Sequence, residues 1–141
     1  MEQTIAEYDS IIKKCKDIFA KKMKDYGSAW TILRISSLTD QILIKTQRIR
    51  SIEEKGSQRI EEGVGSEFIG IVNYSIIGLI QIELGVVDQS EELGYDESMK
   101  LFQKYALQAK FLMLDKKLYI KHIYWCQRKY NHESNNHHSH K

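Results

Sequence analysis

The chain has 141 residues, of which 42% are hydrophobic and 28% are charged, a composition typical of one soluble globular domain. Its formal net charge is only +2 and it contains no proline. The low net charge excludes a nucleic-acid-binding polycation, and the absence of proline favours long helices over a loop-rich β fold. The first residues lack a signal-peptide pattern, and the two cysteines lack metal-ligand spacing. We therefore expect a cytoplasmic protein with reduced thiols.

Two helices are predicted in the first half of the chain. Apolar residues recur at three- and four-residue steps over residues 3–24, which predicts an amphipathic helix that ends near Gly27. A second apolar stripe over residues 38–54 predicts another helix. Residues 56–65 contain three glycines, so we expect a mobile, solvated loop there.

A third helix is predicted over residues 66–84, with Ser66 as its N-cap and Gly85 just beyond its end. Because it is apolar on nearly all sides, we expect it to be the buried central helix of the domain. Its most apolar run, residues 68–80, is shorter than the roughly 20 residues that a membrane-spanning helix needs. The sequence therefore indicates a core helix and no membrane contact.

A fourth helix is predicted over residues 97–115, with Asp96 as its N-cap, and residues 116–130 can continue it. Residues 131–141 are rich in His, Asn and Ser, and we expect this tail to be disordered. Since no segment alternates with the period of a strand, the expected fold class is all-α. We predict a single-domain bundle of four to five helices over residues 1–130.

The connection between the first two helices is the first candidate ligand site. It contains Asp25, Tyr26, Trp30 and Arg34, which is more aromatic and more charged than most helix–helix connections. Tyr and Trp rings can stack on a nucleobase, and an arginine can pair with a phosphate through two hydrogen bonds. The alternative is that Tyr26 and Trp30 are core plugs that seal one end of the bundle.

The second predicted helix carries a candidate phosphate and metal site. Lys45 and Arg48 share one face of the helix, and Asp40 lies on a neighbouring edge near its start. A cationic face beside a carboxylate can hold a phosphate and a Mg²⁺ ion together. The alternative is a solvated face with surface ion pairs.

The third predicted helix carries Glu67 in its first turn, then Asn73 and Tyr74 within the apolar run. Glu67 and Tyr74 are seven residues apart and so face the same way. A buried amide must find hydrogen-bond partners. Asn73 is therefore either a structural hydrogen-bond node or a ligand contact.

These motifs together carry a family resemblance. They are KDYG at residues 24–27 with Trp30 and Arg34, SLTDQI at 37–42 with Lys45, RIRSIE at 48–53, and EFIGIVNYS at 67–75. Over about residues 10–90 the chain resembles the nucleotide modification associated domain family, a bacterial and phage domain of unknown function. The resemblance implies a small helical domain that acts on, or senses, free or DNA-borne modified nucleotides.

The order of elements is also similar to that of the MazG-type all-α nucleoside triphosphate pyrophosphohydrolases, which hold Mg²⁺ with acidic residues on two adjacent helices. Carried over to this chain, that resemblance makes Asp40 and Glu67 the candidate metal ligands. The chain departs from the pattern at Gly70, where phage relatives place a further acid, and it lacks the paired E-x-x-E motifs.

The favoured function is a nucleotide-binding helical domain, extending to Mg²⁺-dependent nucleotide hydrolysis if the metal site exists. This function assigns the base to Tyr26 and Trp30, whose rings stack on it. The residues that contact the nucleotide are Asp25, Tyr26, Trp30, Asn73 and Tyr74. Phosphates are bound by Arg34, Lys45 and Arg48. The alternative is a non-catalytic interaction module that forms homo-oligomers through the third helix. Nucleic-acid binding is not favoured, because the basic residues are dispersed.

Overall fold

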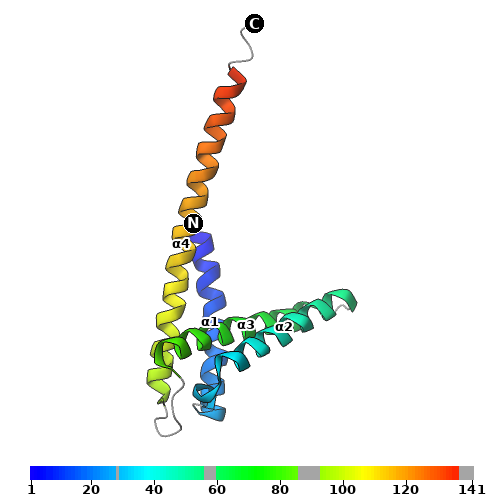
Figure 1. The fold of residues 1–141 in the computed structure, drawn as a ribbon, viewed down its shortest axis with the longest axis vertical. Helices are drawn as coiled ribbons and strands as arrows, with labels where there is room; N and C mark the ends of the chain where they lie inside the picture. Colours follow the sequence, from blue (N-terminus) through cyan, green and yellow to red (C-terminus); the bar gives the residue numbers. More distant parts are fainter. Residues whose placement is uncertain (28, 56–59, 86–92, 137–141) are drawn as a thin grey trace. The chain divides into compact units, whose positions relative to one another are not determined.

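The computed structural model describes residues 1–27, 29–55, 60–85 and 93–136. Over these residues the chain forms four α-helices and one short 3₁₀ helix and contains no strand (Figure 1). The elements are α1 (Glu2–Tyr26), η1 (Ala29–Ile32), α2 (Ile35–Lys55), α3 (Ile60–Leu84) and α4 (Tyr95–Asn136). The predicted all-α bundle is confirmed.

The chain divides into two compact units, Met1–Ala106 and Leu107–Lys141. The first unit contains α1, η1, α2, α3 and the beginning of α4, and it holds every site described below. The second unit is formed by the rest of α4, which continues as one helix to Asn136. The helix thus includes the first part of the tail that we expected to be disordered, and residues 137–141 lie outside the described residues.

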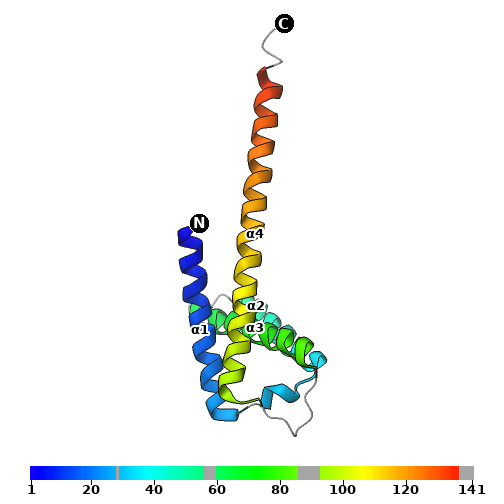
Figure 2. The same ribbon diagram turned by 90° about the vertical axis from the view of Figure 1, so that its left-hand side faces the viewer.

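Helices α2 and α3 lie side by side as an antiparallel pair (Figure 1, Figure 2). Ile52 faces Gly63 near the start of α3, whereas Leu38 faces Gly78 near its other end. Residue numbers therefore rise along one helix as they fall along the other. Glycines at these facing positions allow the two helices to approach closely.

Helix α1 packs against the first turns of α4 within the same unit. The rings of Phe19 and Phe102 are 4.9 Å apart between centroids, and the Tyr8 hydroxyl donates a hydrogen bond of 2.6 Å to the carbonyl of Ala106. A single hydrophobic core joins these helices to α3. Its buried members are Cys15, Phe19, Met23, Leu38, Ile76, Ile77, Ile80, Phe102 and Ala106.

Two predicted helix ends are confirmed by glycines in the left-handed region. Gly27 follows α1 with φ 57°, and Gly85 follows α3 with φ 73°. The Gly85 amide donates to the carbonyl of Gln81 at 2.9 Å, so it satisfies one of the free carbonyls of the last helical turn.

The predicted starts of α3 and α4 are wrong by a few residues. Helix α3 begins at Ile60, so the expected loop over residues 56–65 is in part helical. Ser66 lies inside the helix, where its hydroxyl donates to the Gly63 carbonyl at 2.9 Å instead of capping it. Asp96 lies in the first turn of α4 and does not precede it. Packing of α3 against α2 supplies the stability that a glycine-containing turn lacks by itself.

Helix α3 contacts both α1 and α2 and is therefore the central helix, as predicted. The expected burial of this helix is only partial: Ile76, Ile77 and Ile80 are buried, whereas Phe68, Leu79 and Ile82 are exposed. By length and composition alone, the stretch Gly63–Leu84 could cross a membrane, and 28% of its most apolar window is buried. Core helices of soluble proteins meet the same criterion.

A surface hydrogen-bond network joins α3 to α4 and gives a first prediction. Lys104 Nζ lies 2.5 Å from one oxygen of Glu83, and the Tyr105 hydroxyl donates to the other. Both hydrogen bonds, that of Lys104 first, lower the pKa of the Glu83 carboxyl. The stabilisation is therefore present above the usual glutamate pKa of about 4.3 and is lost as the pH falls through the lower folded-state value.

We expect Glu83→Gln to lower the melting temperature at pH 7, with the difference from wild type vanishing as the pH falls toward 3. Thermal melts followed by circular dichroism would measure this. Glu53→Gln, at an exposed position on α2, is the matched control and should track wild type throughout. A Glu83→Gln difference that persists unchanged at low pH would contradict the prediction.

Candidate functional site

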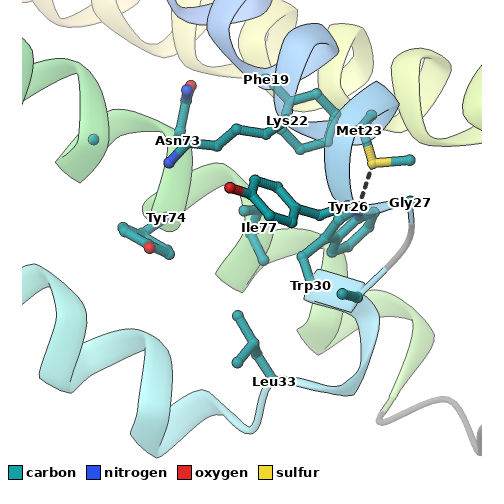
Figure 3. A pocket seen from close by; sticks show the side chains of 12 residues that line it. Phe19, Lys22, Met23, Tyr26, Gly27, Trp30, Leu33, Asn73, Tyr74 and Ile77 are labelled. Atoms are coloured by element: carbon teal, nitrogen blue, oxygen red, sulfur yellow. Dashed lines mark hydrogen bonds between the residues drawn. The ribbon is translucent and has the colours of Figure 1, made fainter.

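A cavity of about 260 Å³ lies at the end of α1 (Figure 3). Its wall is formed by the last turns of α1, by the segment that leads into α2, and by the middle of α3. The lining residues are Phe19, Lys22, Met23, Tyr26, Gly27, Ala29, Trp30, Leu33, Gly70, Asn73, Tyr74 and Ile77.

The end of α1 and the turn at Gly27 create this cavity. Phe19, Met23 and Tyr26 are spaced at three- and four-residue steps, so they share one face of the helix. The left-handed conformation of Gly27 reverses the chain direction after Tyr26 and brings Trp30 back against the same face. An L-residue with a side chain would strain the backbone here.

Trp30 forms part of the wall and is also anchored to the core. Its indole Nε1 donates to the sulfur of Met23 at 2.7 Å, drawn as a dashed line in Figure 3. Its ring lies 5.9 Å from that of Phe19 between centroids, and its carbonyl accepts a hydrogen bond of 3.0 Å from Gln81. Trp30 therefore packs against the core, as the core-plug alternative expects, and it also lines the cavity; its contact with a nucleotide stays a prediction.

Tyr26 is not a core plug, because 73% of its surface is exposed. Figure 3 shows its side chain and that of Lys22 extending from α1 beside each other, with Tyr74 of α3 across from them. The Lys22 ammonium lies 5.9 Å from the centroid of the Tyr74 ring, a distance at which a cation is attracted to a ring face. The cavity thus offers ring faces and one positive charge.

The lining of the cavity carries a positive charge. Lys22 is the one cation among the twelve lining residues, and no lining residue carries a carboxylate. A cleft lined by one sign of charge raises the local concentration of ligands of the opposite sign. This arrangement favours an anionic ligand with a flat ring.

Asn73 is a structural hydrogen-bond node. Its amide nitrogen donates to the main-chain carbonyl of Cys15 at 3.1 Å, which ties α3 to α1. The amide oxygen is buried and has no hydrogen-bond partner among the described residues, so it is not available to a ligand without a local rearrangement. The residue lines the cavity and also holds the cavity's two main walls together.

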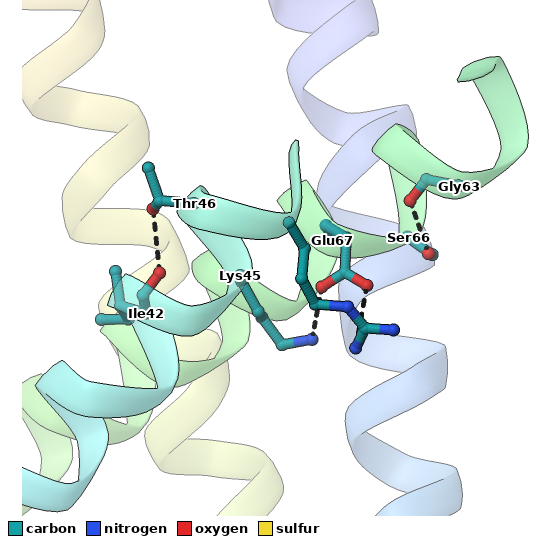
Figure 4. A network of polar contacts seen from close by, with 7 residues as sticks. Ile42, Lys45, Thr46, Gly63, Ser66 and Glu67 are labelled. Carbon is teal, nitrogen blue, oxygen red and sulfur yellow. Dashed lines mark hydrogen bonds and ion pairs between the residues drawn. The ribbon is translucent and has the colours of Figure 1, made fainter. Parts of the chain in front are cut away.

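An ion-pair cluster lies between α2 and α3 (Figure 4). Glu67 is 8% exposed, and its two oxygens face different cations. Lys45 Nζ is 2.9 Å from Oε2, and Arg48 Nη1 is 3.5 Å from Oε1. One turn further along α3, a Cβ on Gly70 would lie 2.4 Å from Lys45 Cε and 2.8 Å from Lys45 Nζ. The glycine therefore provides the space that the end of Lys45 occupies.

The structure separates the predicted site residues into three groups. Tyr26, Trp30, Asn73 and Tyr74 line the cavity. Lys45, Arg48 and Glu67 form the cluster beside Gly70. Asp25, Arg34 and Asp40 are exposed and do not line the cavity.

The predicted Mg²⁺ ligands, Asp40 and Glu67, do not fit a preformed metal site. Magnesium takes several oxygen ligands in octahedral geometry, whereas both Glu67 oxygens face cations. Among the described residues no group of three or more His, Cys, Asp or Glu side chains could hold a metal ion. Binding of Mg²⁺ stays a prediction from the sequence, and no chemical step is derived from it.

Several cavity residues were missed from the sequence, chiefly Phe19, Lys22, Met23 and Leu33. Lys22 is not among the residues that the sequence analysis names as ligand contacts. Its spacing of one helical turn from Tyr26 was the available signal, because residues four apart lie on the same face.

Residues 22–82 match the model of a protein family described as Nucleotide modification associated domain 1. The resemblance expected from the sequence is confirmed for this stretch, which contains the ion-pair cluster and every cavity residue except Phe19. The description links the stretch to nucleotide modification. No curated protein matches the chain. No solved structure matches it either, so the similarity to MazG-type enzymes stays a prediction.

The space at Gly70 gives a second prediction. In Gly70→Ala the new methyl group would overlap the end of Lys45, which must shift and weaken its pair with the buried Glu67. Gly78→Ala is the matched control in the same helix, because the nearest atom there is 4.0 Å away. Both changes gain up to about 1 kcal/mol of helix propensity.

We therefore expect Gly70→Ala to unfold at lower urea concentration than Gly78→Ala, by about 1 kcal/mol in the free energy of unfolding. Equilibrium urea denaturation followed by circular dichroism measures the difference. Equal stabilisation by the two substitutions would mean that Lys45 is not held at the observed position.

Proposed function

We propose that this domain binds a nucleotide in the cavity at the end of α1. The base stacks against the rings of Tyr26 and Tyr74, and a phosphate pairs with Lys22. One observation carries the proposal: four aromatic side chains and a single ammonium group line one cavity, and none of its lining residues carries a carboxylate. The family's description, which concerns nucleotide modification, supports the same class of ligand.

The cavity's size suits a base better than a whole nucleotide. Pockets for drug-sized ligands have volumes of about 300–1,000 Å³, and this cavity is somewhat smaller at about 260 Å³. The sugar and phosphate would therefore extend toward Lys22, whose side chain is exposed. Stacking on aromatic side chains contributes about 1–3 kcal/mol per base, and a hydrogen bond to a charged group about 1.5–3 kcal/mol.

The proposal concerns binding and not hydrolysis. Hydrolysis of a phosphoanhydride needs a positioned base or a metal-bound water, and the described lining contains no carboxylate, histidine or cysteine. Mg²⁺-dependent hydrolysis and homo-oligomer formation therefore stay predictions from the sequence. The prediction of homo-oligomers rests on the apolar third helix, on which Phe68, Leu79 and Ile82 are exposed.

Trp30 supplies a direct test, because its ring forms part of the cavity wall. In a Trp125→Phe background it is the single tryptophan of the chain, which has two. We expect its fluorescence to change on titration with common ribo- and deoxyribonucleoside 5′-monophosphates, in a saturable and base-dependent way.

Two substitutions assign the change to the cavity. Lys22→Ala should weaken binding by about tenfold or more, since it removes a charge-assisted hydrogen bond. Lys21→Ala, which removes the same charge from the neighbouring exposed position outside the cavity, should leave affinity nearly unchanged. Tyr26→Ala should also weaken binding. If no nucleotide alters Trp30 emission, or if Lys21→Ala and Lys22→Ala weaken binding equally, the proposal is wrong.

A further inference from the structure

Gly70 connects the cavity with the ion-pair cluster. It lines the cavity, and the position of its missing Cβ lies 2.8 Å from the ammonium nitrogen of Lys45. The end of Lys45 therefore packs against Gly70, although Lys45 itself is not among the lining residues. The cavity therefore has a second cation close to it, from a different helix than Lys22.

The Lys45 ammonium retains hydrogen-bonding capacity. It has three N–H donors, and one of them is directed to Glu67 at 2.9 Å. No other hydrogen bond of this group is formed with the described residues. The Lys45 side chain is 19% exposed, so part of it is accessible to a ligand without a conformational change.

Glu67 both holds Lys45 in place and offsets its charge. The carboxylate is shared, because Arg48 approaches its other oxygen at 3.5 Å. The cluster thus has two cations and one anion, with a formal net charge of +1. An incoming anion would compete with Glu67 for Lys45, while Arg48 still neutralises the buried carboxylate.

One ammonium group in the lining, that of Lys22, and a second beside Gly70, that of Lys45, would distinguish between anionic ligands of different length. A nucleoside monophosphate has a single phosphate and can satisfy one of them. A di- or triphosphate carries anionic oxygens on successive phosphate groups and can pair with both ammonium groups. Resting on the proposed function, we infer that the cavity binds nucleoside polyphosphates in preference to monophosphates, with Lys45 binding the outer phosphates and Glu67 restraining it in the free protein.

The test compares one nucleoside as its 5′-monophosphate and its 5′-triphosphate, for each common ribo- and deoxyribonucleoside. Trp30 fluorescence in the Trp125→Phe background measures both affinities, and EDTA removes divalent metal. For wild type we expect the triphosphate to bind at least about tenfold more tightly, the effect of one added charge-assisted contact.

Substitutions in the cluster should move this affinity ratio in opposite directions. Lys45→Met keeps most of the side chain's length and removes the charge, so the ratio should fall below about threefold. Glu67→Gln removes the competing anion, so the ratio should rise and the triphosphate affinity should become more salt-dependent. Mere structural damage would lower the affinity for both ligands and would not raise the ratio.

Lys55→Met is the matched control, because Lys55 is an exposed lysine at the end of the same helix. It should leave the ratio at its wild-type value, and thermal melts confirm that each variant is folded at the temperature used. If monophosphate and triphosphate bind wild type equally, or if Lys45→Met and Lys55→Met act alike, this inference is wrong although the proposed function stands. If no nucleotide binds at all, the proposed function itself fails.

Discussion

The packing of Phe19 is the interaction on which the rest of this unit depends. Its ring packs with the rings of Phe102 of α4 and of Trp30, and it also forms part of the cavity wall. A buried aromatic side chain contributes far more apolar area than any polar contact nearby. The same ring therefore stabilises the core and fixes the position of the segment that closes the cavity, so core and site are not independent.

Three polar side chains of α3 bind three different neighbouring segments. Glu67 pairs with cations of α2, Asn73 donates to α1, and Gln81 donates to the segment after Gly27. Each of these buried groups attaches the apolar central helix to a different neighbour, and hydrogen bonds of this kind specify orientation because an unpaired buried group is costly. Of these three groups, Asn73 is the one that lines the cavity.

Sequence patterns were most informative where one residue type has one physical role. The left-handed glycines at 27 and 85 end their helices as expected, because a Cβ is unfavourable in that conformation. Patterns were least informative where tertiary contact overrides local preference: Gly63 and Ser66 suggested a loop and a cap, and both lie within α3. For the candidate site, the sequence names the aromatic residues Tyr26, Trp30 and Tyr74, whereas Lys22 is found only from the structure, because several other lysines share its helix.

The sequence by itself determined the all-α class and the turn after α1, since hydrophobic periodicity and glycine conformation are local properties. Only the tertiary structure decided which charged residues lie near the cavity. Lys45 and Glu67 are on different helices, and their pairing beside Gly70 depends on the register of α2 against α3. That register is set by side-chain packing between the helices, which no local pattern encodes.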